Sequence, residues 1–119
     1  MKTSIGVLAF IAALLCAPAA FAHAFLERAA PAVGSVVHAP PVELRLWFTE
    51  ELEPAFSTVR VLDAHGKQVD KQDPSVDPDD HRLLRVSLPA LAPGTYHVAW
   101  RVRSHTHMTT GDFTFEVAP

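Results

Sequence analysis

The chain has a single cysteine in 119 residues, and this Cys16 lies in an N-terminal segment that we expect to be removed. The remaining residues can therefore form no disulfide, even in an oxidising compartment where disulfides persist. Thiolate metal sites and cysteine nucleophiles are excluded there for the same reason. Met108 is the only methionine beyond the N-terminal segment, so soft sulfur ligands are almost absent. The domain must be stabilised by packing.

Long apolar runs are equally scarce. The run from Ile5 to Cys16 is shorter than the roughly 20 residues of a membrane-spanning helix. It follows Lys2 and precedes the small-x-small tripeptide Ala20-Phe21-Ala22, which is the pattern of a secretory signal peptide. We therefore expect residues 1–22 to be a signal peptide and residues 23–119 to be one mature domain, a monomer without stable membrane insertion.

Positive charge is also in short supply. Removal of Lys2 with the leader leaves nine Lys and Arg against thirteen Asp and Glu, a net charge of −4 with neutral histidines. This balance disfavours binding to nucleic acid and to anionic membrane surfaces. It is compatible with a cationic ligand.

Helical periodicity is missing too, because apolar residues alternate with polar ones between short turns rich in Pro, Gly and Asp. Val42, Leu44, Leu46 and Phe48, for example, share one face of a predicted strand. The aspartate-rich segment 70–80 predicts a mobile loop. The expected strands cover residues 42–48, 57–62, 68–69, 83–88, 96–103 and 111–117.

Tyr96 follows a Pro-Gly turn at the start of a strand. This position is typical of the tyrosine corner of immunoglobulin-like sandwiches, in which the hydroxyl bonds to upstream backbone. The fold class we predict is therefore all-β, an immunoglobulin-like Greek-key β-sandwich or barrel of about seven strands.

Histidines, in contrast, are abundant, and three of the seven carry a functional hypothesis. Cleavage after Ala22 would make His23 the first residue, whose α-amine and imidazole could chelate one metal ion. His105 and His107 have the i, i+2 spacing that places both side chains on one side of an extended chain. The other four are interpreted as ordinary polar residues: His38, His65, His81 and His97.

A site with several nitrogen ligands favours copper(II), which prefers tetragonal nitrogen and oxygen coordination and heads the divalent affinity order. Zinc would bind the same groups more weakly and as a tetrahedron. The metal ligands we predict are His23, His105 and His107, with copper(II) as the bound ion.

Over nearly the whole mature length the chain resembles the CopC family of periplasmic copper-binding proteins. The resemblance is carried by an ordered set of short matches: His23-Ala24, Pro31 with Gly34, Phe48-Thr49-Glu50, residues 53–57, residues 93–96, Trp100-Arg101-Val102, and His107 followed by Gly111, Phe113 and Phe115. It implies copper(II) binding through the N-terminal histidine and a D-x-H motif near the last strand. On this basis His23 and His107 correspond to ligands and Glu50 to a neighbouring residue.

Two departures from the family pattern are visible. His105 stands where the family usually has aspartate, in a segment one residue shorter than usual, so its imidazole either replaces the carboxylate as a ligand or is turned away by the shorter loop. The methionine-rich stretch of copper(I)-binding members is missing. The resemblance therefore implies a copper(II)-only periplasmic carrier or buffer, not an enzyme, with a CopD-like inner-membrane importer as a partner.

Two other functions compete with this interpretation. A histidine-brace copper oxidase or mono-oxygenase would use the same N-terminal histidine, although no further acid or base group accompanies it. An immunoglobulin-like interaction module without a metal would make the histidines incidental.

Overall fold

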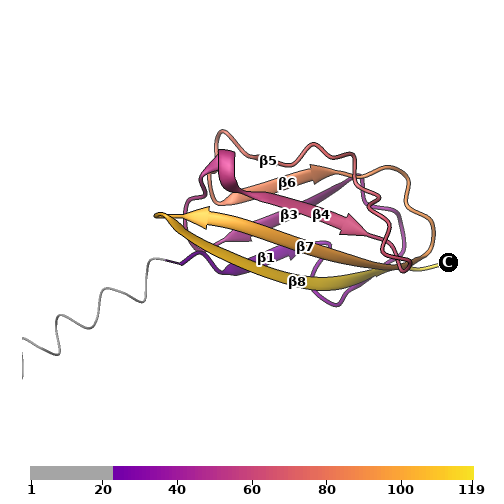
Figure 1. The fold of residues 1–119 in the computed structure, drawn as a ribbon. Helices are drawn as coiled ribbons and strands as arrows, with labels where there is room; N and C mark the ends of the chain where they lie inside the picture. The colour runs from indigo at the N-terminus through magenta and orange to yellow at the C-terminus, as the bar shows by residue number, and fades with distance from the viewer. Residues whose placement is uncertain (1–22) are drawn as a thin grey trace, which may run out of the picture.

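The computed structural model describes residues 23–119, which fold into two β-sheets packed face to face (Figure 1). The predicted signal peptide and its cleavage site lie outside these residues. One sheet has the order β1-β3-β6-β5 and the other β2-β8-β7-β4. The strands are β1 (Leu26–Ala30), β2 (Val36–Val37), β3 (Glu43–Phe48), β4 (Thr58–Leu62), β5 (Ser75–Val76), β6 (Leu83–Ser87), β7 (Gly94–Ser104) and β8 (His107–Val117), with a 3₁₀ turn, η2 (Pro54–Phe56).

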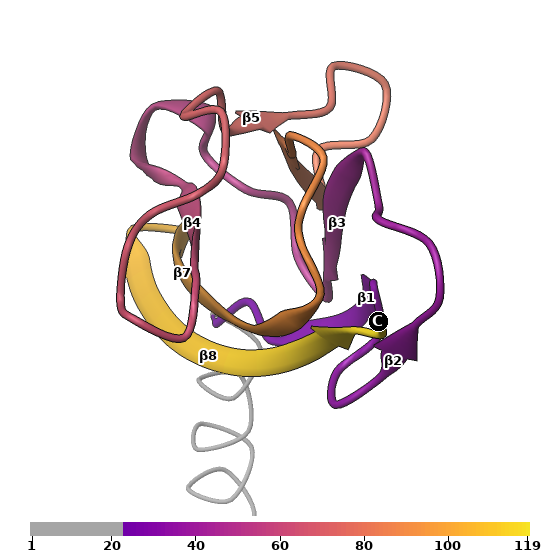
Figure 2. The ribbon, with the colours of Figure 1, turned by 90° about the vertical axis from the view of Figure 1, so that its right-hand side faces the viewer.

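This arrangement confirms the predicted immunoglobulin-like Greek-key sandwich. Neighbouring strands are antiparallel except β2, which pairs in parallel with the end of β8. The described residues contain eight strands where about seven were expected, because β2 and β5 are only two residues long. Figure 2 shows the curved β7–β8 hairpin closing one side of the sandwich against β1 and β3.

The core follows from the alternation along the strands. Leu44, Leu46 and Phe48 of β3 are fully buried, and they face Val98 and the other inward residues of the second sheet. Val42 departs from the expected pattern, since it precedes β3 and its side chain is 82% exposed. The strand begins one residue later than the alternation indicates, so no opposing sheet covers Val42.

The tyrosine corner is confirmed. The hydroxyl of Tyr96 donates a hydrogen bond to the backbone carbonyl of Ala92, and the ring stacks on Phe115 with centroids 5.6 Å apart. The turn before β7 is thereby tied to the core.

Residues 70–80 form the expected loop except at β5, but hydrogen bonds fix the path of this loop, which the sequence did not predict. The segment contains β5, and the buried Asp70 accepts hydrogen bonds from the backbone N–H groups of Val61 and Gln72. Asp73 accepts one from the N–H of Ser87 in the same way. Composition suggests disorder because it counts the missing apolar surface, but these carboxylates order the segment through hydrogen bonds to backbone.

No helix among residues 23–119 is long and apolar enough to cross a membrane.

Candidate metal site

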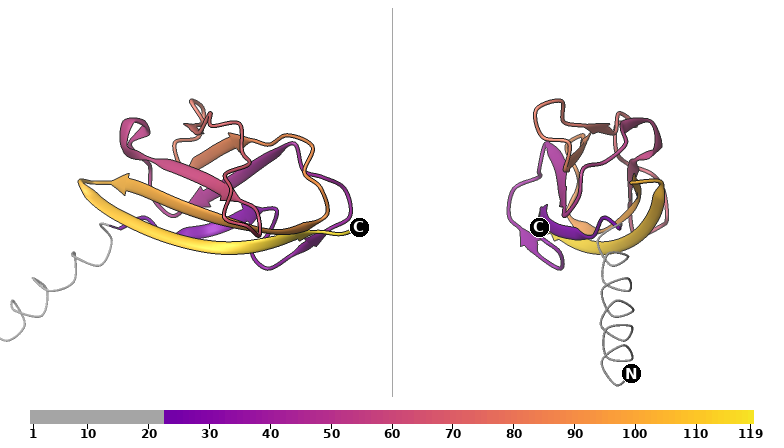
Figure 3. Two further views of the ribbon diagram at one scale, coloured as in Figure 1. Left: turned by 45° about the vertical axis from the view of Figure 1, so that its right-hand side comes forward. Right: turned by 90° about the vertical axis from the view of Figure 1, so that its left-hand side faces the viewer.

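The start of the described chain and the tip of the β7–β8 hairpin lie at the same end of the sandwich (Figures 1 and 3). The ring centroids of His23 and His107 are 4.6 Å apart, and the rings are tilted by 48°. These two predicted ligands are separated by 84 positions in the sequence, and they meet because the segment after His23 bonds to β8 on one side and to the end of β3 on the other.

Two threonines hold the N-terminal segment in this place. The hydroxyl of Thr109 on β8 donates to the carbonyl of Ala24 at 2.9 Å, and the hydroxyl of Thr49 accepts from the N–H of Phe25 at 3.0 Å. Ala24 is 1% exposed, so its backbone is fixed in the core. His23 is therefore positioned by hydrogen bonds to both sheets.

The strand β8 is four residues longer than the sequence predicted and begins at His107 itself. Because His107 pairs with Ser104 across the hairpin, its position on the sheet is fixed by the β7–β8 register. Ser104 is 1% exposed and its hydroxyl has no hydrogen-bond partner within residues 23–119. A buried hydroxyl thus lies on the strand opposite His107.

The predicted geometry of the His105 and His107 pair is wrong. His105 and Thr106 form the two-residue turn between β7 and β8, with φ of 50° and 69°, so the chain is not extended there. Positive φ at both central residues is the conformation of a type I′ hairpin turn. The alternation argument for the pair fails because it assumes a strand where the chain reverses.

His105 instead lies beside Glu50, with its Nε2 atom 3.6 Å from a carboxylate oxygen. The imidazole is 62% exposed and the Glu50 side chain 29% exposed. Glu50 follows β3 in a segment fixed to β7 by the hydrogen bond from the Glu53 N–H to the Arg103 carbonyl. The end of the sandwich at the hairpin tip therefore carries two residue pairs, His23 with His107 and His105 with Glu50.

In the described part of the chain, no three His, Cys, Asp or Glu side chains are already arranged around one point where a metal ion would sit. The structure brings His23 and His107 together and leaves His105 on the turn. The other histidines are on exposed positions elsewhere: His38, His65, His81 and His97. Sequence reasoning missed Thr49 and Thr109, because a threonine at a strand end is too common to indicate an anchor.

Fold and site together define a small β-sandwich with a histidine pair at the end where its N-terminal segment meets a β-hairpin. The chain belongs to the CopC family: the model of the CopC domain matches residues 26–118. The match begins three residues after His23.

Relatives of similar length support this assignment. The protein YobA of Escherichia coli strain K12 is 34% identical over 112 residues, 92% of this chain and 90% of the relative. The copper resistance protein C of Pseudomonas syringae pv. tomato is 34% identical over 115 residues, 91% of this chain and 90% of the relative.

Solved structures show the same fold. CopC from Methylosinus trichosporium OB3b superposes with a TM-score of 0.72 at 37% identity, covering 82% of this chain and 95% of that one. PcoC, a methionine-rich copper resistance protein from Escherichia coli, superposes with a TM-score of 0.69 at 34% identity, covering 81% and 99%.

Proposed function

We propose that this protein is exported, cleaved between Ala22 and His23, and then binds one copper(II) ion as a periplasmic carrier or buffer. The observation that carries the proposal is the 4.6 Å approach of the His23 and His107 rings. Copper as the cargo is supported by the names of relatives that are called copper resistance protein C.

The chemistry follows from the nitrogen ligands. After cleavage the α-amine and imidazole of His23 would close a chelate ring on the ion, and the imidazole of His107 would bind from the hairpin. We assign His105 as a third imidazole, supplied by the turn, with Glu50 beside it as a neighbouring negative charge. Nitrogen ligands without thiolate favour copper(II) over copper(I).

Titration of the exported, metal-free protein with copper(II) tests the ligand set. We expect one tight site whose electron paramagnetic resonance spectrum shows nitrogen hyperfine coupling. His23→Ala and His107→Ala should each weaken binding at least tenfold, since even the loss of a residue that only positions a ligand typically costs about 10–100-fold in metal affinity. The matched control is His97→Ala, an exposed histidine on β7 that should leave the affinity unchanged. Wild-type affinity in His23→Ala would refute the ligation.

Mass spectrometry of the exported protein tests the processing step. The expected N-terminal residue is His23, which alone frees the α-amine for the chelate. A mature chain that begins at another residue would contradict the proposal.

As a carrier, the protein would act as a monomer and pass its copper to a CopD-like inner-membrane protein. It also excludes catalysis, so the copper-loaded protein should consume no more oxygen with a reductant than free copper does. Oxygen consumption above that control would favour the histidine-brace enzyme. Equilibrium dialysis that leaves the protein free of copper would instead favour the interaction module.

A further inference from the structure

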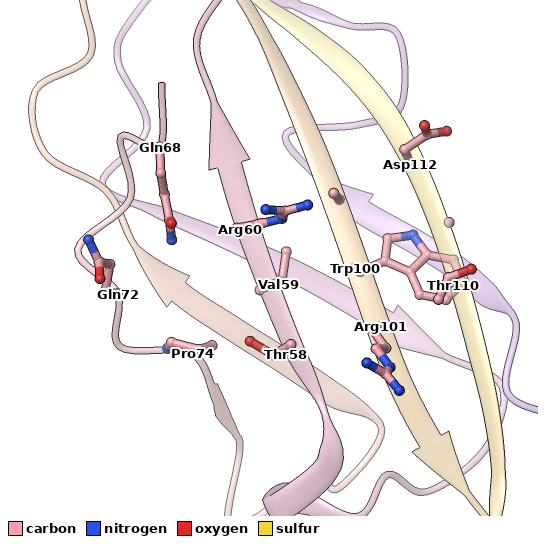
Figure 4. Close-up of a pocket in the computed structure, with 12 residues that line it drawn as sticks. Thr58, Val59, Arg60, Gln68, Gln72, Pro74, Trp100, Arg101, Thr110 and Asp112 are labelled. Carbon is pink, nitrogen blue, oxygen red and sulfur yellow. The ribbon is translucent and has the colours of Figure 1, made fainter. Parts of the chain in front are cut away.

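A groove of about 840 Å³ crosses the outer face of the sheet that contains β4, β7 and β8 (Figure 4). Its floor comes from these strands, whose outward residues alternate with core residues: Thr58 and Arg60 are exposed, and Val59 and Val61 are buried. One wall is formed by the segment that contains Gln68, Gln72 and Pro74. The volume lies in the usual range of ligand sites.

Two unneutralised cations lie in this groove. Arg60 on β4 and Arg101 on β7 are both exposed, and neither has a carboxylate within 4.0 Å among residues 23–119. Asp112 also lines the groove, but Figure 4 shows its side chain directed away from both arginines. In a chain with a formal net charge of −3, the groove is therefore a local positive site.

The wall beside the arginines is fixed before any ligand arrives. Asp70 is 6% exposed, and its carboxylate accepts hydrogen bonds from the Val61 N–H at 2.8 Å and the Gln72 N–H at 3.0 Å. It also accepts one from the Gln68 amide at 3.2 Å. Binding in a preformed groove loses less conformational entropy than binding that must order a loop.

The groove continues toward the tip of the β7–β8 hairpin through a second hollow with two exposed apolar side chains. This second hollow, of about 370 Å³, shares Thr58 and Arg101 with the groove and is also lined by Phe56, Met108 and Arg103, whose guanidinium lies over the Phe56 ring and pairs with Glu53. Phe56 is 54% exposed and Met108 is 38% exposed. Met108 and His107 are neighbours on β8 and project from opposite faces of the strand, so the surface runs from two arginines to the hairpin tip, on the other face from the histidine pair.

We propose that this surface binds an extended acidic segment of a partner protein. Carboxylates of the segment would pair with Arg60 and Arg101, since guanidinium groups bind carboxylates with two parallel hydrogen bonds. An apolar side chain that follows the acidic stretch would cover Phe56 and Met108. A small free anion would fill only the arginine end, whereas a peptide matches the joined length of the groove and the hollow and could also cover the exposed Phe56 and Met108.

The inference deepens the proposed function in one respect, because the bound segment would bring its protein to the His107 end, where copper would be exchanged. Binding of the segment itself depends only on the groove. His23→Ala should therefore keep full affinity for the peptide, which separates failure of this inference from failure of the copper site.

Nuclear magnetic resonance titration of the ¹⁵N-labelled, metal-free protein tests the groove. The probe is the peptide acetyl-Glu-Asp-Glu-Leu-Phe-amide, and its matched control is acetyl-Gln-Asn-Gln-Leu-Phe-amide. We expect amide shifts at Arg60, Arg101 and Thr110 with the acidic peptide, and weaker binding of the neutral one. Substitution of both arginines, Arg60→Gln with Arg101→Gln, should weaken binding about tenfold or more, as expected for the loss of charged pairs.

The charge-matched control is Arg28→Gln with Arg82→Gln, two exposed arginines that do not line the groove. It should leave the affinity for the acidic peptide unchanged. Equal weakening in both double variants, or shifts confined to another face, would overturn the proposal. If free glutarate bound as tightly as the peptide, the groove would be a site for small anions and the peptide proposal would be wrong. If phosphatidylglycerol vesicles bound through the same arginines and the peptide did not bind, the groove would be a membrane-binding surface and the peptide proposal would be wrong.

Discussion

At the residue scale, Gly111 shows how a residue without a side chain leaves room for a large one. It pairs with Trp100 across the β7–β8 hairpin, and a Cβ atom built on it would lie 2.3 Å from Cζ2 of the indole. The indole cannot easily move away, because it packs edge-on against Phe48 with ring centroids 5.1 Å apart. An aromatic ring that covers a strand glycine also shields its backbone.

We therefore expect Gly111→Ala to lower the free energy of unfolding by about 2 kcal/mol, the usual cost of overpacking a core. Urea denaturation followed by tryptophan fluorescence measures the change. Thr110→Ala, at the exposed neighbouring position, should stay within about 0.5 kcal/mol of wild type. Equal stability of Gly111→Ala and wild type would show that the indole is free to shift.

At the element scale, the β7–β8 hairpin positions His107 and carries a strained turn. Thr106 has a φ of 69°, a left-handed conformation that a β-branched residue rarely adopts. Type I′ turns favour glycine at this position, since glycine has no Cβ to clash. Two strands of eleven residues hold the turn in place despite this cost.

Thr106→Gly should therefore raise the free energy of unfolding by about 1 kcal/mol, because the left-handed conformation loses its steric cost. The same substitution in the middle of β8, Thr114→Gly, should instead destabilise the protein. Thermal unfolding of both variants provides the comparison. A lower melting temperature for Thr106→Gly would contradict a strained turn.

The loops between strands depend on aspartate carboxylates in a pH-dependent way. The hydrogen bond from the Lys67 N–H holds the pKa of Asp63 below its ordinary value of 3.8. Hydrogen bonds from the side chain and backbone of Ser87 lower the pKa of Asp73 in the same way. A carboxyl whose pKa is lower in the folded state stabilises the protein above the unfolded pKa. This stabilisation is lost as the pH falls through 3.8 and toward the folded pKa.

The double variant Asp63→Asn with Asp73→Asn should therefore lose less stability than wild type between about pH 5 and pH 3. Asparagine keeps an acceptor oxygen but cannot titrate, so the comparison isolates the protonation step. Urea denaturation across this pH range gives the two profiles, with Asp79→Asn as a control at an exposed position. Parallel profiles for the double variant and wild type would rule out both carboxyls as the cause.

At the scale of the whole molecule, copper would join the N-terminal segment to the last hairpin, since His23 and His107 belong to opposite ends of the chain. An ion that binds only the folded state stabilises it in proportion to the logarithm of its free concentration. The imidazoles must be deprotonated to bind, so the effect depends on pH as well.

Free copper(II) at 100 times its dissociation constant should raise the free energy of unfolding of the exported protein by about 2.7 kcal/mol. A chelator should remove the gain, and acidification should reduce it, because protons compete with the metal for the ligand nitrogens. Thermal unfolding with and without copper measures the difference. At the same free copper concentration His23→Ala, with an affinity at least tenfold lower, should gain at most about 1.4 kcal/mol, whereas His97→Ala should match wild type.

Much of the fold could be predicted from residue patterns, since alternation and turn residues are local properties of the chain. The tyrosine corner and the buried faces of β3 and β7 follow from spacing alone. The short strands β2 and β5 could not be predicted in this way, because two residues carry no measurable period. Their pairing depends on strands far away in the sequence.

The amino-acid sequence alone determined which side chains could bind a metal, and it determined the all-β sandwich that carries them. Only the tertiary structure decided which of these side chains meet. His23 and His107 are brought together by hydrogen bonds of the N-terminal segment to Thr49 and Thr109, whereas His105 is directed to Glu50 by the reversal of the chain at the turn. Spacing along a chain predicts proximity only while the chain keeps one conformation, and contacts between distant segments depend on how the sheets pack.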